Sequence, residues 1–264
     1  MIRKTITQGL LIAASIVALW FALSQIDYMN WFGIRKSAVN TEEKLGELIW
    51  ESIERTEKII RNDSINAAID SIVTRITKAN KIDRKKIKVH VIRKSDVNAF
   101  AFPGNHLVVF TGLIDACENE SELAGVIGHE IAHIRKKHVM KKLVREIGLA
   151  TLIATAGGNG GTATGEILRA LTSSAYDRKL ETEADLTSVD YLVKADIDPE
   201  PFAELMYRMS ADIDLPEAVY WISSHPESEA RAKEIISYIK DKDVEPRQIL
   251  SDSKWKWLKN KVSV

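Results

Sequence analysis

Two histidines four residues apart, His129 and His133, are the residues of this chain best placed to carry chemistry. On an α-helix, residues four apart lie about 40° from each other around the axis and one turn along it, so both rings can face one ion. Glu130 lies about 100° from His129, where it can accept a proton from a water on that ion without filling its coordination shell. A zinc protease needs three ligands, an open position and a nearby carboxylate. The run therefore indicates one catalytic Zn²⁺, with Glu130 as general base.

The third ligand is not supplied by the same helix. A run of this length also arises by chance on ordinary helices, so it needs support from elsewhere in the chain. The metzincin pattern would require a glycine and a histidine after His133, at the positions that Lys136 and Val139 occupy. On a continuous helix His138 would lie about 140° from His133, so we expect it on the polar face or behind the ligands. The remaining ligand must come from another segment.

An acidic segment downstream offers that ligand. Glu181 and Asp185 share one face of a predicted helix, while Glu183 points nearly the opposite way. The chemistry suggests Glu181 as the third ligand and Asp185 as acceptor of the spare ring proton of a ligand histidine. A salt-bridged helix face is the alternative for this segment alone. Together with the histidine pair, the metal-site interpretation is favoured.

These motifs together resemble peptidase family M48, the gluzincin proteases of the HtpX and mitochondrial Oma types and the CAAX prenyl endopeptidases. The resemblance implies an α+β, predominantly helical, zincin-like gluzincin fold with a small β-sheet beside the helix of the histidine pair. It also implies Glu181 as zinc ligand, with Asp185 and Arg178 next to the ligands. A single apolar N-terminal segment is similar to the single-anchor bacterial envelope type. The matching residues are 98–104, 111–113, 129–133, 178–185, 225–226 and Arg231.

Two further segments are candidates for binding substrate. A polypeptide is usually cleaved while extended along a sheet edge, and the resemblance implies that role for Asn98, Ala99 and Phe100. An ordinary core strand is the alternative for this segment. His225 precedes a proline in a turn-forming context that the resemblance places near the mouth of the active site. We hypothesise that His225 approaches the zinc or the developing oxyanion, and an exposed loop histidine is the alternative.

The elements that must position these residues follow from hydrophobic patterning. Asn119 and Glu122 form a capping box, which predicts a long helix from there through the histidine pair to about Gly148. The stretch 156–165 is read as a loop between helices, and the tail from Glu245 as a capping helix or a docking segment. We also expect two amphipathic helices within 41–81, strands at 87–92, 97–102 and 106–111, and helices near 174–194, 199–210 and 227–240.

The N-terminus predicts a membrane anchor. Residues 5–26 carry no charge and follow Arg3 and Lys4, and this length approaches the ~20 residues that span a bilayer. We favour a retained signal anchor, with the catalytic domain on the extracytoplasmic side; secretion after signal cleavage is the alternative.

The predicted organisation is a signal anchor or signal peptide at 1–27, a helical segment packing on the core at 28–84, a zinc metalloprotease domain at 85–240 and a C-terminal tail at 241–264.

Composition excludes several classes of protein. The 264 residues carry 37 basic and 37 acidic side chains, so the chain lacks the basic excess of a nucleic-acid binder. The single cysteine, Cys117, excludes an intramolecular disulfide and a cysteine-rich zinc site. Gly158, Gly160 and Ala163 fit a dinucleotide-binding spacing, but the strand-turn-helix context is poor and no lysine completes a phosphate-binding loop, so we expect no nucleotide. Adaptors and self-association stay open.

The sequence thus predicts a zinc-dependent endopeptidase that acts on polypeptide substrates, namely unfolded or misassembled envelope and membrane proteins. The alternative is a non-proteolytic membrane protein, chaperone-like or binding, that keeps zinc for folding or regulation. Glu130 favours the enzyme, because a structural zinc site does not need a neighbouring carboxylate and usually fills all four positions with protein ligands.

Overall fold

The computed structural model describes residues 34–159, 163–173, 175–211, 219–226 and 228–263. The chain divides into two units, Met1–Thr41 and Glu42–Val264, and the second contains the sheet and every candidate site residue. The predicted signal segment at 1–27 lies outside the described residues. Among the helices that are described, none combines the length and the apolar character needed to cross a bilayer.

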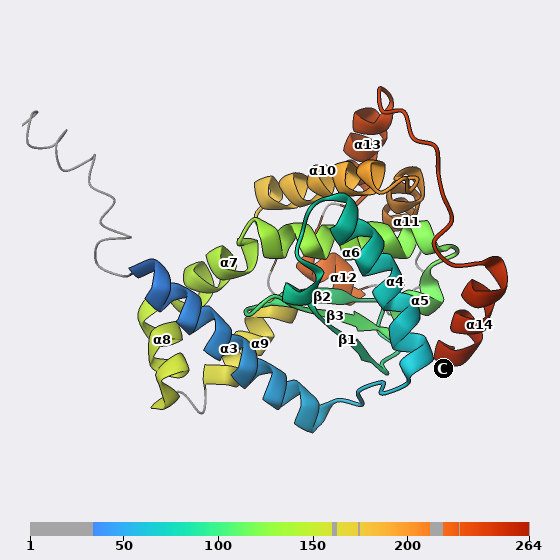
Figure 1. Ribbon diagram of the computed structural model, residues 1–264. Helices are drawn as coiled ribbons and strands as arrows, with labels where there is room; N and C mark the ends of the chain where they lie inside the picture. Colours follow the sequence, from blue (N-terminus) through green and yellow to red (C-terminus); the bar gives the residue numbers. More distant parts are fainter. Residues whose placement is uncertain (1–33, 160–162, 174, 212–218, 227, 264) are drawn as a thin grey trace, which may run out of the picture. The chain divides into compact units, whose positions relative to one another are not determined.

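Helices make up most of the second unit, arranged around a small sheet (Figure 1). The first half of the chain contributes α3 (Ile34–Thr56), α4 (Asp63–Ala79), the 3-10 turn η1 (Arg84–Lys86), α5 (Thr111–Ala116), α6 (Glu120–Arg135) and α7 (His138–Ile147). The second half contributes α8 (Leu149–Ala154), the π-helical turn η2 (Thr155–Asn159), α9 (Ala163–Ser173), α10 (Arg178–Lys194), α11 (Glu200–Ala211), α12 (Val219–Ser224), α13 (Ser228–Ile239) and α14 (Asp252–Val262).

The sheet has three strands in the order β1 (Lys88–Ile92), β3 (His106–Phe110) and β2 (Ala99–Phe102). β1 runs parallel to β3, and β2 runs antiparallel to it. The hairpin turn between β2 and β3 uses two left-handed residues, Gly104 at φ 77° and Asn105 at φ 61°. β2 therefore lies at one edge of the sheet, and all three strands fall inside their predicted ranges.

The central helix α6 lies between the sheet and a layer of helices. It contacts β2 on one side and α10 and α11 on the other (Figure 1). At the crossing with α11, a Cβ atom on Gly125 would lie 2.3 Å from the Cβ of Phe202, so only glycine allows this approach. At the crossing with α10, the Ser188 hydroxyl donates to the Gly125 carbonyl at 2.8 Å. The predicted fold class, predominantly helical with a small sheet beside this helix, is confirmed.

The prediction of one long helix from Asn119 to about Gly148 is wrong, because the segment forms two helices. α6 ends at Arg135, and α7 begins at His138 after Lys137 adopts the left-handed conformation at φ 58°. Neither glycine nor proline marks this break. The Lys137 ammonium pairs with Glu42 of α3 at 3.0 Å, and the new helix direction buries Val139. The break brings His138 behind His133 instead of leaving it on a polar face.

The glycine-rich stretch is also more ordered than predicted. Its first part belongs to the π-helical turn η2, in which Gly158 has a positive φ of 92°, and α9 already begins at Ala163. Glycine tolerates that φ because it lacks a Cβ atom. Residues 160–162 lie outside the described residues.

The C-terminal tail forms a capping helix, the first of its two predicted alternatives. α14 packs on α5, with Leu258 and Val262 buried. The Trp255 indole donates to the Glu118 carbonyl at 3.1 Å. Just before α14, the Glu120 carboxylate accepts hydrogen bonds from the backbone N–H groups of Ile249 and Leu250 at 2.6 Å each. The tail is thereby joined to the first turn of α6.

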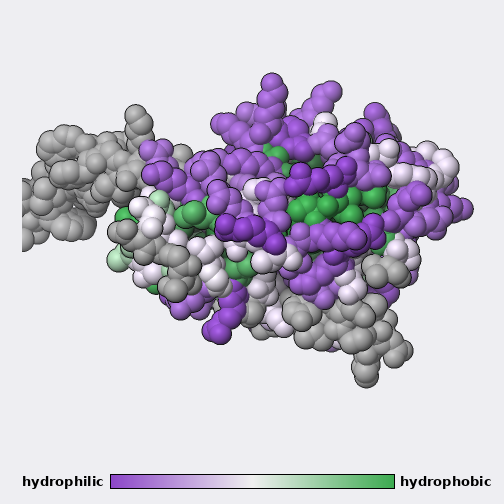
Figure 2. All heavy atoms as spheres, turned by 90° about the horizontal axis from the view of Figure 1, so that it is seen from below, coloured by the Kyte–Doolittle hydropathy of each residue, from purple (hydrophilic) through white to green (hydrophobic). Residues whose placement is uncertain are grey.

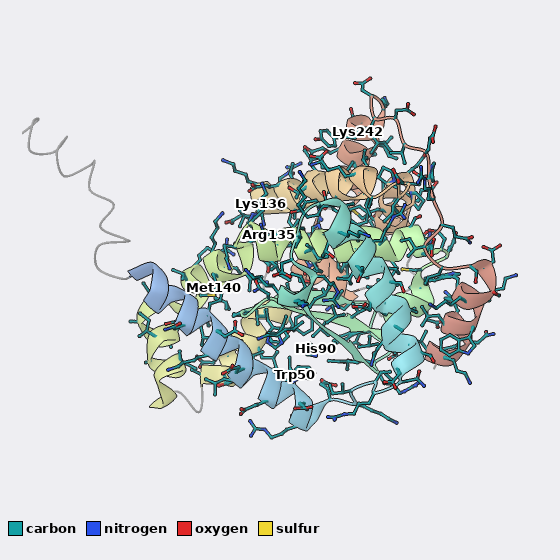
Figure 3. All side chains as sticks on the ribbon, viewed as in Figure 1. Trp50, His90, Arg135, Lys136, Met140 and Lys242 are labelled. Carbon is teal, nitrogen blue, oxygen red and sulfur yellow. The ribbon has the colours of Figure 1, made fainter. Side chains whose placement is uncertain are left out.

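A stack of rings joins α3 to the sheet. Trp50 of α3 stacks on His90 of β1 with ring centroids 3.6 Å apart (Figure 3). Nε2 of His90 lies 2.9 Å from Nδ1 of His106, which in turn stacks on Phe102 at 4.4 Å. Burial lowers the pKa of His90 to about 4 and that of His106 to about 3, and the positive charge of Lys88 adds to both shifts. Both imidazoles are therefore neutral near pH 7.

The imidazole pair predicts that mild acid destabilises the fold. In the unfolded chain each histidine has a pKa of about 6.5. In the folded chain the pKa is about 4 for His90 and about 3 for His106. Because the unfolded state binds more protons in this window, the free energy of unfolding falls as the pH drops from 6.5 towards 4. The slope is at most about 1.4 kcal/mol per pH unit for each histidine. Chemical denaturation at a series of pH values measures it.

A His90→Phe variant is the control, since it keeps a ring under Trp50 but cannot be protonated. Acids and histidines away from this pair titrate alike in both proteins, so the difference between the two stability profiles reports His90 and its effect on His106. The variant should lose less stability between pH 6.5 and 4. Parallel profiles would contradict the assignment.

Candidate metal centre

Four buried side chains converge in the second unit. α6 supplies His129 and His133, α10 supplies Glu181, and His225 follows the end of α12. Each offers one ligand atom, and these atoms all lie within 4.8 Å of one another. None of the four residues is more than 1% exposed. The structure thus brings the three predicted ligands together and adds His225 to them.

The distances within this group suit a zinc ion. Nε2 of His133 lies 2.9 Å from Nε2 of His129 and 3.3 Å from Oε1 of Glu181. Nδ1 of His225 lies 3.2 Å from Nε2 of His129 and 3.0 Å from Oε2 of Glu181. Tetrahedral zinc with bonds of about 2.0–2.1 Å separates its ligand atoms by about 3.3 Å, and imidazole and carboxylate are donors that zinc accepts. Donor types and spacing therefore both fit.

His225 gives the group a fourth donor. Its ring stacks on Trp221 with centroids 4.3 Å apart, and its Nε2 lies 3.5 Å from Oε1 of Glu130. A catalytic zinc site keeps one position open for water, whereas a structural site fills all four with protein ligands. With His225 included, the group has as many protein donors as a structural site.

Asp185 and Arg231 support the ligands from behind. Oδ1 of Asp185 lies 2.9 Å from Nδ1 of His129, and its negative charge favours the tautomer that keeps the proton on Nδ1 and presents Nε2 to a metal. The Arg231 guanidinium donates to both oxygens of Asp185 at 2.7 Å and lies 2.5 Å from Oε2 of Glu181. Burial by itself raises the pKa of a carboxyl. Here His225 and Arg231 hold the pKa of Glu181 well below its usual range, and Arg231 lowers that of Asp185.

The guanidinium in this network is not the one predicted from the sequence. Arg178, expected beside the ligands, is exposed at the first residue of α10, before the helix becomes buried at Glu181. Arg231 of α13 makes the contacts instead and is 2% exposed. Arg231 was part of the sequence resemblance. Because it lies 50 positions after Glu181 in the chain, spacing alone did not predict its ion pairs with Glu181 and Asp185.

Glu130 lies beside the group and connects it to the sheet. Its side chain is 1% exposed, and burial, reinforced by the negative charge of Glu181, raises its pKa well above the usual range. A backbone hydrogen bond from Ala101 of β2 opposes that rise. The candidate base is therefore held against the edge strand of the sheet.

The edge strand β2 directs some of its backbone groups towards Glu130. The Phe110 N–H donates to the Asn98 carbonyl at 3.1 Å, so Asn98 and, by alternation, Phe100 bond to β3. Ala99 and Ala101 then direct their backbone groups away from β3, as the contact of Ala101 with Glu130 requires. Asn98, Ala99 and Phe100 are all buried, and within the described residues Oδ1 of Asn98 has no hydrogen-bond partner.

A further layer lies behind His133, where one of the two predicted alternatives placed His138, while Tyr176 and Lys142 were not predicted there. Nδ1 of His138 lies 3.1 Å from Nδ1 of His133, and Nε2 of His138 lies 3.2 Å from Oε2 of Glu183. Tyr176 stacks on His133 with centroids 4.1 Å apart, and the buried Lys142 ammonium lies 4.2 Å from the centre of the Tyr176 ring. This layer depends on the break after α6, for which the sequence carries no glycine or proline signal.

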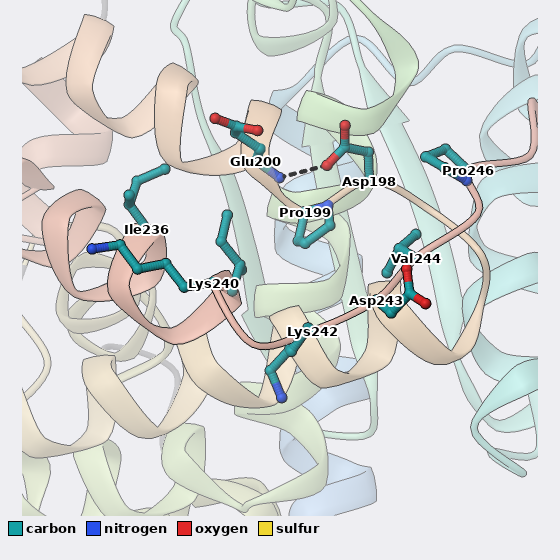
Figure 4. A pocket seen from close by; sticks show the side chains of 10 residues that line it. Asp198, Pro199, Glu200, Ile236, Lys240, Lys242, Asp243, Val244 and Pro246 are labelled. Atoms are coloured by element: carbon teal, nitrogen blue, oxygen red, sulfur yellow. Dashed lines mark hydrogen bonds between the residues drawn. The ribbon is translucent and has the colours of Figure 1, made fainter.

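A surface pocket lies apart from these residues. It has a volume of about 370 Å³ and is formed by the start of α11, the end of α13 and the segment after it (Figure 4). Its rim carries both charges, including Asp198, Glu200, Lys240 and Lys242, and the Glu200 N–H donates to Asp198 at 3.0 Å. None of its lining residues belongs to the metal group.

Comparison with known proteins agrees with this geometry. The sequence profile described as Peptidase family M48 matches residues 63–239, which include every residue of the metal group. Mitochondrial metalloendopeptidase OMA1 of Schizosaccharomyces pombe is 29% identical over 180 residues, 67% of this chain and 53% of that protein. Metalloprotease LoiP of Escherichia coli is 30% identical over 163 residues, 59% of this chain and 64% of that protein.

A putative beta-barrel assembly-enhancing protease of Vibrio cholerae is 25% identical over 185 residues, 65% of this chain and 38% of that protein. The chain thus spans about half the length of the Schizosaccharomyces pombe relative and less of the Vibrio cholerae relative.

The contact between Asp185 and His129 predicts a loss of metal affinity on substitution. Asp185→Asn keeps the shape of the side chain but removes the charge that faces His129 and Arg231. Zinc affinity should fall about 10–100-fold, the usual effect of losing such a supporting carboxylate. Competition with a coloured chelator measures it. The matched control is Asp190→Asn on the same helix, whose carboxylate is 42% exposed and pairs with Lys242. Equal affinities in the two variants would contradict the role of Asp185.

Proposed function

The chain belongs to peptidase family M48, and we propose from this premise that it is a zinc-dependent endopeptidase. The observation that carries the proposal is the buried convergence of His129, His133 and Glu181, with Glu130 beside them. A site built only to hold a metal has no need of the additional carboxylate of Glu130.

The residues of the site have two roles: three of them would bind the metal, and Glu130 transfers the proton. His129, His133 and Glu181 would hold one zinc ion, which when bound acidifies a water and polarises the scissile carbonyl. Glu130 accepts the proton of the attacking water and then donates it to the leaving amine. Burial raises the pKa of Glu130, which favours its protonated form for the second transfer. Asp185 and Arg231 keep the ring of His129 and the carboxylate of Glu181 in place.

The substrate is a polypeptide in extended conformation that pairs with the edge strand at Asn98, Ala99 and Phe100. Two features support this part of the proposal. The backbone groups of Ala99 are directed away from β3, and the backbone of Ala101 contacts Glu130. A peptide added at this edge would pass the base. Because backbone pairing supplies the affinity, such a site accepts many sequences.

We further propose that the substrates are unfolded or misassembled envelope and membrane proteins. The similarity to a putative beta-barrel assembly-enhancing protease supports this class. The proposed location is the extracytoplasmic face of a membrane, with residues 1–27 as a retained anchor; release after signal cleavage is the alternative. The uncharged segment after Arg3 and Lys4 supports the anchor.

One observation favours a second function. With His225 included, the group has four protein donors, as a structural zinc site does. A non-proteolytic protein, chaperone-like or binding, would keep zinc in such a site for folding or regulation. Glu130 separates the two functions, because only the enzyme uses it.

The test compares the wild type with Glu130→Gln on a chemically unfolded protein, with bound zinc and cleavage measured on the same samples. The variant should keep its zinc and lose about 10²–10⁴-fold in turnover, the range typical of a lost general base. Glu229→Gln is the control: Glu229 forms an exposed ion pair with Lys233, so both readouts should stay at wild-type values.

Two results would oppose the enzyme as proposed. If wild type and variant both bind zinc and neither cleaves unfolded or native envelope proteins, the binding protein is favoured. If Glu130→Gln cleaves normally, Glu130 is not the base.

His225 gives a separate prediction. We propose that it contacts the metal or the developing oxyanion during turnover, so His225→Ala should lower kcat about 10²–10³-fold, the usual effect of losing one such donor. Three ligands remain, and zinc content serves as the control. Full turnover in the variant would remove this role, and turnover above wild type would show that His225 blocks the site instead.

A further inference from the structure

Exposed hydrophobic side chains gather on α7 and α8, and none of them belongs to the metal group. Among the described residues, four large hydrophobic side chains are exposed, and three of them fall here: Val144 at 39%, Leu149 at 55% and Ile153 at 52%. The fourth is Tyr207 of α11 at 52%. Leu152 points inward and is fully buried, so α8 is docked by one face and presents the other to solvent.

The sequence around this surface separates charge from apolar character. The run Arg135–Arg145 holds six basic residues and no acidic one, and all six except Lys142 are exposed. After Glu146, the 19 residues Ile147–Gly165 carry no charge. In Figure 2 the end of the molecule where α8 lies shows green and white residues among purple ones. A solvent-exposed helix without a single charged residue is unfavourable in water.

The basic side chains lie close to the apolar ones. Lys141 lies one turn before Val144 on α7, so the two share a face. Arg145 pairs with Glu146 and Asp177, whereas Lys141 pairs with no carboxylate in the described part of the chain. Arg135 and Lys136 are also exposed at the end of α6 (Figure 3), and the Lys136 ammonium pairs with Glu183 at 3.0 Å.

We propose that this face contacts an anionic membrane surface, with Val144, Leu149 and Ile153 inserted among the lipid headgroups and Lys141 and Arg145 facing their negative charge. Exposed apolar side chains flanked by cations are the signature of an interfacial membrane element. The uncharged run cannot span the bilayer, because Gly148 and Gly158, both at positive φ, interrupt its helices. It is therefore an element that lies on the membrane.

The position of this face gives it a functional consequence. α7 begins at His138, whose ring contacts that of His133. The membrane contact would hold the metal group close to the bilayer surface, where unfolded membrane proteins are exposed. If the proposed N-terminal anchor is retained, it raises the effective concentration of the face at the membrane.

The test attaches a fluorescent dye to a cysteine introduced on this face. Cys117 is fully buried, so a cysteine introduced at the surface of the full chain can be labelled selectively. The probe is the environment-sensitive dye NBD on Ile153→Cys, and the matched control is the same dye on Tyr207→Cys, a side chain with the same 52% exposure. Each protein is mixed with vesicles of equimolar phosphatidylglycerol and phosphatidylcholine that contain spin-labelled lipid.

At position 153 the emission should shift to the blue and be quenched by the spin-labelled lipid, and at position 207 it should do neither. The effect at 153 should weaken in vesicles of phosphatidylcholine alone and in a Lys141→Glu/Arg145→Glu background. Zinc content reports that each protein is folded. These readouts do not use proteolysis, so failure of this proposal and failure of the proposed enzyme are distinguishable.

Three results would overturn the proposal. Equal responses at 153 and 207 would mean that the face has no preference for lipid. Shielding of the probe at 153 before vesicles are added, independent of protein concentration, would mean that another segment of the chain covers it. Shielding that grows with protein concentration without lipid would mean that a second copy covers it.

Discussion

The buried ion pairs of Arg231 are the interaction on which the rest of the site depends. Three carboxylates, Glu130, Glu181 and Asp185, are removed from water in one region, and an isolated buried carboxylate is strongly unfavourable. Arg231 neutralises two of them directly, and Lys142 lies close enough to lower the pKa of Glu130. A divalent cation beside these carboxylates would add to the same attraction. Metal binding and stability of the fold are therefore coupled, because the donor group that binds the ion exists only in the folded chain.

Local periodicity accounts for the part of the site that could be predicted from sequence. His129 and His133 share a helix face because they are four residues apart, and the same spacing aligns Glu181 with Asp185. Family resemblance joined these two pairs, and the structure brings them together. Sequence spacing does not predict residues that meet only through tertiary contacts. Arg231 reaches the carboxylates from α13, so nothing in the spacing distinguishes it from Arg178.

The fold shows the same division between local and tertiary causes. The three strands, α4, α11 and α13 follow from alternation, helical periodicity and turn residues, and they lie where these patterns predict them. The break after α6 does not, because Lys137 takes a left-handed conformation that glycine or asparagine usually occupies. Its ion pair with Glu42 and the burial of the following turn stabilise that conformation. Tertiary packing overrides local preference there, and the position of His138 changes with it.

The four donors of the metal group differ in how firmly the fold holds them. His129 and His133 lie on one helix, which packs too closely against α11 at Gly125 to shift. Glu181 is held by a buried guanidinium. His225 follows α12, a helix of six residues, and a helix of that length has little stability of its own. Its position depends on side-chain packing such as the stack with Trp221. His225 is thus the donor whose position depends most on side-chain packing, and replacing it leaves the other three donors in place on α6 and α10.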